Sequence, residues 1–332
     1  MKKSKLLVIS ALALSGVLAS CGGSKPASSS QEPASNDPAE KVTVRTGVGM
    51  VKASFSDKGE LSTYIGGAVT DGTKVLATQV DCLVIAVKAG ETAPTLDGES
   101  KYVKKAVEGQ AIISKLDLGP DYGMGEDGYK KNCDAINTLF ATKTIAEAAN
   151  VTEIEGVTIV GDDLIASGKE AIAYSVKDVI TSKPQAGKAA VDNSAQVEKG
   201  STLYFGLGYS TSFSAKKAQM DITIFSGLFK EDGTVVSGRL DVSQYKFAQD
   251  DKKVLTTSGG DLSKQELGTD YHMGTETIDE VYVQMDVYTK GLQGMKVTDL
   301  TADTEISGCT VSTGAYVAAA KDAFAKKVQV TA

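Results

Sequence analysis

The eleven-residue stretch Ser114-Lys-Leu-Asp-Leu-Gly-Pro-Asp-Tyr-Gly-Met124 occurs a second time, with changes, as Ser263-Lys-Gln-Glu-Leu-Gly-Thr-Asp-Tyr-His-Met273. Seven of the eleven positions are identical, and an eighth exchanges Asp for Glu. Self-similarity of this length within one chain is typical of an internal repeat. The stretch therefore predicts that the chain carries two copies of one structural unit.

Shorter matches lie upstream of both copies and follow the same order. They are Gly47-Val-Gly49 with Gly206-Leu-Gly208, Ser54-Phe-Ser56 with Ser212-Phe-Ser214, Asp71-Gly-Thr73 with Asp232-Gly-Thr234, and Asp81 with Asp241. The loop between Asp81 and Ser114 is longer than the loop between Asp241 and Ser263, and this one difference accounts for the smaller offset between matched residues further along the chain. We predict two homologous domains, residues 41–180 and 201–332, joined at 181–200 by a linker rich in Ser, Lys, Gln and Ala.

Each copy opens with runs typical of β-strands and ends with a run typical of a helix. Asp-Gly turns at Asp71 and Asp232 separate the strand-like runs, which is a strong hairpin signal. The closing runs Ala171–Ile180 and Ala315–Phe324 are expected to be helical. Strands first and helices later predict an α+β fold, with an antiparallel strand-rich opening in each domain.

The repeated Leu-Gly-x-Asp-Tyr-x-Met element has two interpretations. Tyr122 and Tyr271 could stack on the ring of a ligand, while Asp121 and Asp270 accept hydrogen bonds from it. Alternatively, the glycine makes a turn, the aspartate caps a short helix, and the tyrosine packs inside. The presence of the element in both copies favours the structural interpretation.

The N-terminus reads as an export signal. Lysines at positions 2, 3 and 5 precede an apolar run from Leu6 to Ala19, which is too short to span a membrane. The run ends in Leu18-Ala19-Ser20-Cys21, which resembles the lipobox of bacterial lipoproteins. The resemblance implies a signal peptide at 1–20, lipidation of Cys21, and a lipid anchor on the extracytoplasmic face of the cell membrane. Residues 21–40 lack large apolar side chains and are expected to form a disordered tether.

Composition excludes several classes of function. Lys and Arg number 35 against 42 Asp and Glu, and only Arg45 and Arg239 are arginines, which argues against nucleic-acid binding. Removing residues 1–20, with three lysines and no acid, takes the net charge from -7 to -10. The single histidine, His272, rules out a multi-histidine metal site, and we expect no metal. We expect Cys82 to be a buried free thiol, although export would permit a bridge to Cys133.

The sharpest local motif is Ser307-Gly308-Cys309-Thr310 ahead of the last helical run. It resembles the end of the small FMN-binding domain of ion-pumping respiratory complexes and surface flavoproteins, in which a threonine is esterified to FMN phosphate. The resemblance implies FMN attached to Thr310 and a turn shaped by Ser307 and Gly308. On the functional interpretation of the Asp-Tyr element, Asp270 and Tyr271 would contact the cofactor. The alternative is a plain turn that caps a helix. Cys309 stands where that family has Ala, and the first copy lacks the threonine.

Two functions follow from these patterns. The chain also resembles a group of uncharacterised lipoproteins of Gram-positive anaerobes, which carry Lys-x-Glu-Leu-Gly-x-Asp-Tyr-x-Met. The first hypothesis is an extracytoplasmic electron carrier of tandem FMN-binding-like domains, served by a membrane redox partner. The alternative is a non-enzymatic binding, adhesive or envelope-structural lipoprotein with a cell-envelope partner. In neither case do we expect a turnover enzyme, because nothing shared by the two copies pairs a nucleophile with a base.

Overall fold

The computed structural model describes residues 39–332 apart from 102–112, 126–127 and 158–160. The predicted signal peptide, Cys21 and nearly all of the tether lie outside these residues. The segment Ala39–Ala332 forms one compact unit. Within the described part of the chain, no helix is both long and apolar enough to cross a membrane.

The first repeat contains three long strands, two short ones and a set of helices, and one further strand closes it. Its elements are β1 (Lys41–Phe55), β2 (Glu60–Thr70), β3 (Val75–Lys88), β4 (Thr95–Leu96), β5 (Ile113–Ser114), α2 (Lys115–Leu118), the 3-10 helix η1 (Gly119–Tyr122), α3 (Gly128–Phe140), α4 (Ile145–Ala148), α5 (Asp162–Ser175) and β6 (Ala195–Glu198). The expected helix at Ala171–Ile180 therefore ends at Ser175. The expected linker, 181–200, contributes β6.

The second repeat follows the same plan. Its elements are β7 (Thr202–Ser214), β8 (Gln219–Phe229), β9 (Val235–Gln249), β10 (Leu255–Gly259), α6 (Lys264–Leu267), η2 (Gly268–Tyr271), α7 (Val281–Gly291), η3 (Val297–Asp299), α8 (Gly314–Ala325) and β11 (Val328–Thr331). The isolated bridges Lys74–Thr144 and Thr234–Lys296 occupy equivalent places in the two repeats. The two repeats are therefore alike even in these isolated backbone bridges.

Each repeat builds one antiparallel sheet, and helices follow it. The strand orders are β4-β3-β2-β1-β6, with β5 also paired to β3, and β10-β9-β8-β7-β11. Strands β6 and β11 are equivalent, because each pairs with the first strand of its own repeat. The prediction of an α+β fold with two similar halves is confirmed.

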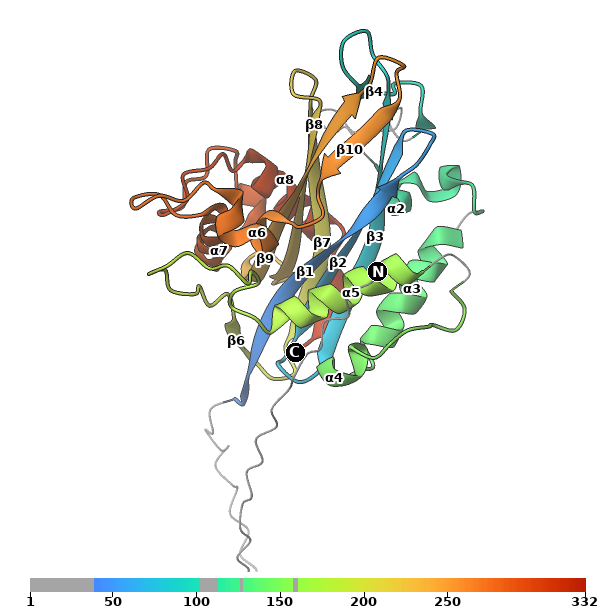
Figure 1. Ribbon diagram of the computed structural model, residues 1–332. Helices are drawn as coiled ribbons and strands as arrows, with labels where there is room; N and C mark the ends of the chain where they lie inside the picture. The colour runs from blue at the N-terminus through green and yellow to red at the C-terminus, as the bar shows by residue number, and fades with distance from the viewer. Residues whose placement is uncertain (1–38, 102–112, 126–127, 158–160) are drawn as a thin grey trace, which may run out of the picture. The chain divides into compact units, whose positions relative to one another are not determined.

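The sheets and helices form four layers, in the order helices, sheet, sheet, helices (Figure 1). Alternation along each strand separates the two faces of a sheet. In β3, Cys82 and Val84 pack with α3 and α5, whereas Leu83 and Ile85 pack with the second sheet. The two repeats thus share one apolar core between their sheets, and each has a second core beneath its own helices.

The repeated Gly-x-Gly motif lets the last helix of each repeat lie directly on the first strand. A Cβ atom on Gly47 would lie 2.0 Å from the Ala171 oxygen, and one on Gly208 would lie 2.0 Å from the Ala323 nitrogen. Such distances are far below van der Waals contact, so only glycine permits this packing. This explains the match between the motifs at 47–49 and 206–208.

The repeated eleven-residue stretch forms a short helix followed by a 3-10 turn. Ser114 and Ser263 are the N-caps, and their hydroxyls accept from the backbone N–H of Asp117 and Glu266 at 2.7 and 3.2 Å. The glycines after the helices, Gly119 and Gly268, have φ of 52° and 54° and serve as C-caps. The structure thus confirms the turn that the glycines predicted.

The matched aspartates of β3 and β9 hold these short helices in place. Oδ1 of Asp81 accepts from the backbone nitrogens of Cys82 at 2.7 Å and Leu116 at 3.3 Å. Oδ1 of Asp241 accepts from Val242 at 2.7 Å and Gln265 at 3.1 Å. Burial raises the pKa of both carboxyls to about 7. They are structural anchors common to the two repeats.

These carboxyls predict a pH-dependent stability. Their unfolded pKa is about 3.9, so folding favours the protonated form, and stability is lost as the pH rises from about 4 through about 7. We expect the free energy of unfolding to be larger at about pH 5 than at about pH 8, by about 2 kcal/mol for each site. The double substitution Asp81→Asn with Asp241→Asn should remove that part of the slope in urea titrations. The exposed Asp57→Asn serves as the control; a double variant with the wild-type slope would contradict the assignment.

Candidate functional site

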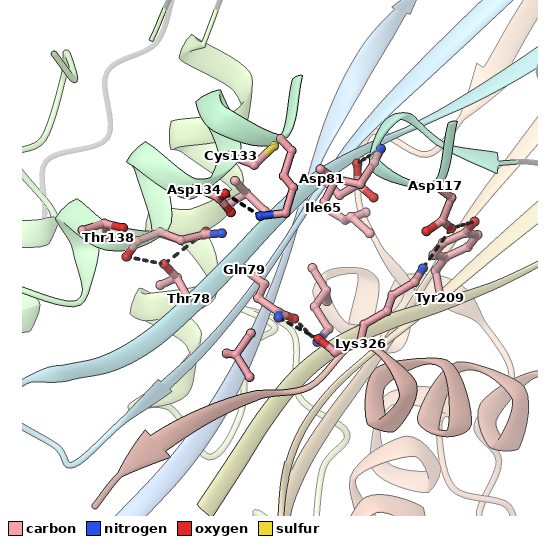
Figure 2. Close-up of a pocket in the computed structure, with 16 residues that line it drawn as sticks. Ile65, Thr78, Gln79, Asp81, Asp117, Cys133, Asp134, Thr138, Tyr209 and Lys326 are labelled. Carbon is pink, nitrogen blue, oxygen red and sulfur yellow. Dashed lines mark hydrogen bonds and ion pairs between the residues drawn. The ribbon is translucent and has the colours of Figure 1, made fainter. Parts of the chain in front are cut away.

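A cavity of about 640 Å³ is lined by polar groups from both repeats. The first repeat lines it with residues of β2, β3, α2 and α3. The second repeat contributes Leu207, Tyr209, Lys326 and Val328. We call this space the inter-repeat cavity; Figure 2 shows α3 and the end of α8 on opposite sides of it.

One side of the cavity carries a cluster centred on Lys326. Its Nζ lies 3.0 Å from Oδ2 of Asp117 and 2.9 Å from Oδ2 of Asp322. The Tyr209 hydroxyl donates to Oδ2 of Asp117 at 2.7 Å, and the Tyr209 backbone nitrogen donates to Oδ2 of Asp322 at 2.9 Å. The cluster therefore ties α2 of the first repeat to β7 and α8 of the second (Figure 2).

The charges in this cluster reinforce one another. Burial alone would lower the pKa of Lys326, but the carboxylates of Asp322 and Asp117 outweigh it and raise that pKa. Burial raises the pKa of Asp322, and Lys326 opposes that rise. Lys326 also lies over the Tyr209 ring, 4.3 Å from its centroid. Lys326 is therefore positively charged at neutral pH and fixed between the repeats.

A second cross-repeat contact closes the inner side of the cavity. The Gln79 side chain of β3 donates to the Lys326 carbonyl oxygen at 3.0 Å and accepts from the Leu207 nitrogen at 2.6 Å. The Lys326 carbonyl lies at the C-terminal end of α8, where helix carbonyls lack partners within the helix. Gln79 thereby caps a helix of the other repeat.

The opposite side of the cavity is the exposed face of α3. Lys130 and Asp134 form an ion pair of 2.5 Å along this helix, and Asn137 and Thr138 continue the polar lining. Cys133, which is buried, also lines the cavity and is a free thiol. Burial raises the pKa of its thiol, so the reactive thiolate is disfavoured.

The predicted FMN motif lies elsewhere, in the loop before α8. Gly308 has φ of 90°, as the motif's turn requires. Thr310 is exposed, and its nitrogen and hydroxyl both donate to Oε1 of Gln284, at 2.7 and 3.1 Å. The helix N-cap is Thr313, whose hydroxyl donates to the Ala302 carbonyl at 3.1 Å and makes no capping bond. The motif is thus neither part of the inter-repeat cavity nor a side-chain cap of α8.

The side chains of this loop do not fit FMN. Residues 302–313 line a shallow hollow by themselves, and they include Asp303 and Glu305 but no basic residue. Two carboxylates would oppose a phosphate, and the aromatic rings nearest in sequence, Tyr288 and Tyr316, are buried. The features present that the FMN resemblance would require are the turn at Gly308 and the exposed Thr310.

The Asp-Tyr elements belong to the two helical cores. Tyr271 packs against the core beneath α7 and α8, which Cys309 and Val311 also border, and Lys264 lies 5.0 Å from its ring centroid. Asp270 pairs with Lys183 at the surface. Tyr122 packs in the same way in the first repeat, with its ring 5.2 Å from that of Tyr129. Neither Asp270 nor Tyr271 lines the inter-repeat cavity.

The cavity was not predicted from the sequence, because its polar groups are dispersed along the chain. The match between Asp81 and Asp241 was visible in the sequence, but these aspartates hold the short helices in place and do not indicate a ligand site. The spacing of Asp322 and Lys326, one helical turn apart, was the available signal. Comparisons of the chain with protein-family profiles, curated proteins and solved structures found no match.

The geometry of the loop leads to a prediction about Thr310. Because the loop carries the carboxylates of Asp303 and Glu305 and no basic side chain, we expect the mature protein, co-expressed with a flavin transferase, to gain no FMN mass and to lack a flavin absorption band. Thr310→Val should have the same mass, apart from the substitution, and the same spectrum. An added FMN mass that disappears in Thr310→Val would contradict this expectation and support the electron carrier.

Proposed function

We propose that this chain is an exported, lipid-anchored binding protein whose ligand occupies the inter-repeat cavity. The observation that supports it is the convergence of Asp117, Tyr209 and Lys326 from both repeats on one side of an open cavity of about 640 Å³. Cavities of this size with few converging polar groups are typical ligand sites. The anchor would be acyl chains on Cys21, which hold the binding unit outside the membrane.

The lining favours binding over catalysis. Asp117 and Lys326 are paired with each other, and Lys130 is paired with Asp134. Among the described residues that line the cavity, none combines an activated nucleophile with a neighbouring base, since Cys133 is a buried thiol of raised pKa. Apolar side chains such as Ile65, Val80 and Leu116 supply the remaining contact surface.

A thermal-shift screen with a blocked variant tests this proposal. We expect at least one member of a panel of amino acids, short peptides, oligosaccharides, polyamines and nucleotides to raise the melting temperature of the mature protein. A ligand at 100 times its Kd stabilises the folded state by about 2.7 kcal/mol. The exposed Thr138 lines the cavity, so Thr138→Trp should abolish the shift by placing an indole in it.

The matched control is Lys131→Trp, an exposed position on the same helix that does not line the cavity. This variant should keep the shift. The proposal fails if no member of the panel raises the melting temperature, or if Thr138→Trp responds as strongly as the wild type.

A further inference from the structure

The second repeat has a groove equivalent to the inter-repeat cavity. Counted back from the equivalent bridge residues Thr144 and Lys296, Asp134 of α3 corresponds to Asp286 of α7. By the same count Lys130 corresponds to Tyr282. Each repeat therefore has the same surface between its short capped helix and its long helix.

In the second repeat, residues 177–188 of the chain lie in this groove. The Thr181 hydroxyl donates to the Glu266 carbonyl at 2.9 Å, and the Thr269 nitrogen donates to the Lys183 carbonyl at 3.0 Å. The Gln185 nitrogen donates to the Tyr282 hydroxyl at 2.7 Å. The segment has no helix or strand of its own. Backbone and side-chain groups of the segment both contribute to its binding, as in many complexes with extended peptides.

Two lysines of this segment add charge contacts. Lys183 pairs with Asp270, and Lys188 pairs with Asp279. Both acids belong to the second repeat. An extended stretch with basic side chains thus matches the acidic rim of its groove.

Equivalent residues of the two grooves differ in how far they are exposed to solvent. Tyr282 and Asp286 are 3% and 2% exposed, whereas Lys130 and Asp134 are exposed. A Cβ on Gly268 would lie 2.3 Å from the Thr181 hydroxyl oxygen, whereas one on the equivalent Gly119 would meet nothing within 4 Å. Among the residues that the structure describes, the groove of the second repeat is covered and that of the first repeat is open.

Chain length explains why the segment after α8 cannot cover the first repeat in the way that the segment after α5 covers the second. Residues 176–194 lie between α5 and β6, so the chain can cross to the second repeat and return. In the equivalent place α8 passes to β11 through Lys326 and Lys327 alone. These two residues are too few to reach across the cavity.

We propose that the inter-repeat cavity binds an extended polypeptide segment of another protein, in the manner in which residues 177–188 occupy the equivalent groove. Asp117 and Asp134 of the cavity lining are each paired with a lysine, and Asp81 is buried with a raised pKa, so the apolar side chains of the lining set the preference for a ligand. Short aliphatic side chains, like Val179 and Ile180 of the covering segment, suit the apolar part of the lining. This inference rests on the proposed function, because it names the class of ligand for the same cavity.

The probe is a fluorescein-labelled peptide with the sequence of residues 177–188, titrated into the mature full chain and followed by fluorescence anisotropy. We expect saturable binding with a Kd on the order of 100 μM. Thr138→Trp should weaken it at least about tenfold, and Lys131→Trp should leave it unchanged. A peptide with Asp in place of its Val179 and Ile180 residues should bind at least about tenfold more weakly, because it places charges against the apolar part of the lining.

Three results would overturn the inference. Absence of saturable binding, while a non-peptide of the thermal-shift panel still binds through the cavity, would leave the proposed function standing and remove the peptide. Equal binding to Thr138→Trp would place the peptide elsewhere. A dimer of the wild type that Thr138→Trp abolishes in sedimentation would make a second copy of the chain the occupant.

Discussion

The apolar faces of the two sheets pack against each other, and every other contact between the repeats depends on this packing. Val48, Ile65 and Leu83 of the first sheet meet Ile222, Ile224 and Tyr245 of the second. The Thr63 hydroxyl lies 2.9 Å from that of Tyr245, so a hydrogen bond joins the sheets within this apolar layer. Face-to-face packing leaves each sheet with an outer face for its own helices, which produces the four layers.

Sheet packing also decides where side chains of one repeat meet the helix ends of the other. Gln79 of β3 reaches the carbonyl of Lys326, and the equivalent Arg239 of β9 reaches the carbonyls of Lys177 and Asp178. Arg239 is almost fully buried, and Asp286 lies 2.9 Å from its guanidinium. Gln79 thus caps the last helix of the second repeat, and Arg239 binds the backbone just beyond the last helix of the first. Because the two repeats are alike, packing their sheets against each other creates two such contacts and two grooves.

The two grooves differ because the chain after the last helix differs in length. The segment from 176 to 194 fills one of them with its residues 177–188. In that repeat, the side chains of Arg239 and Gln265 both donate hydrogen bonds to Asp286. The other groove keeps the exposed pair Lys130 and Asp134 beside the Lys326 cluster. Internal occupation of one groove by the protein's own backbone is the reason to expect a polypeptide in the other.

Local patterns in the sequence predicted the parts of the fold that are locally determined. The Asp-Gly turns and the turns at Gly119 and Gly268 follow from residues near one another in the chain. The sequence suggested an aspartate as the cap of the short helices, whereas Ser114 and Ser263 are the N-caps. Strand β6 and the close approach of Gly47 to Ala171 were not predicted, because their partners, β1 and α5, are distant in sequence. The cavity was hidden for the same reason, since Gln79, Asp117 and Lys326 meet only when the sheets pack.

The central claim is that the two repeats form one structure through their shared core, and calorimetry of the mature chain tests it most directly. If the inter-sheet core and the contacts of Gln79 and Arg239 hold the repeats together, heating should give one cooperative transition whose calorimetric and van't Hoff enthalpies agree. Two separate transitions, one for each repeat, would contradict the claim. They would show that each sheet is stable without the other and that the cavity between them is not a fixed site.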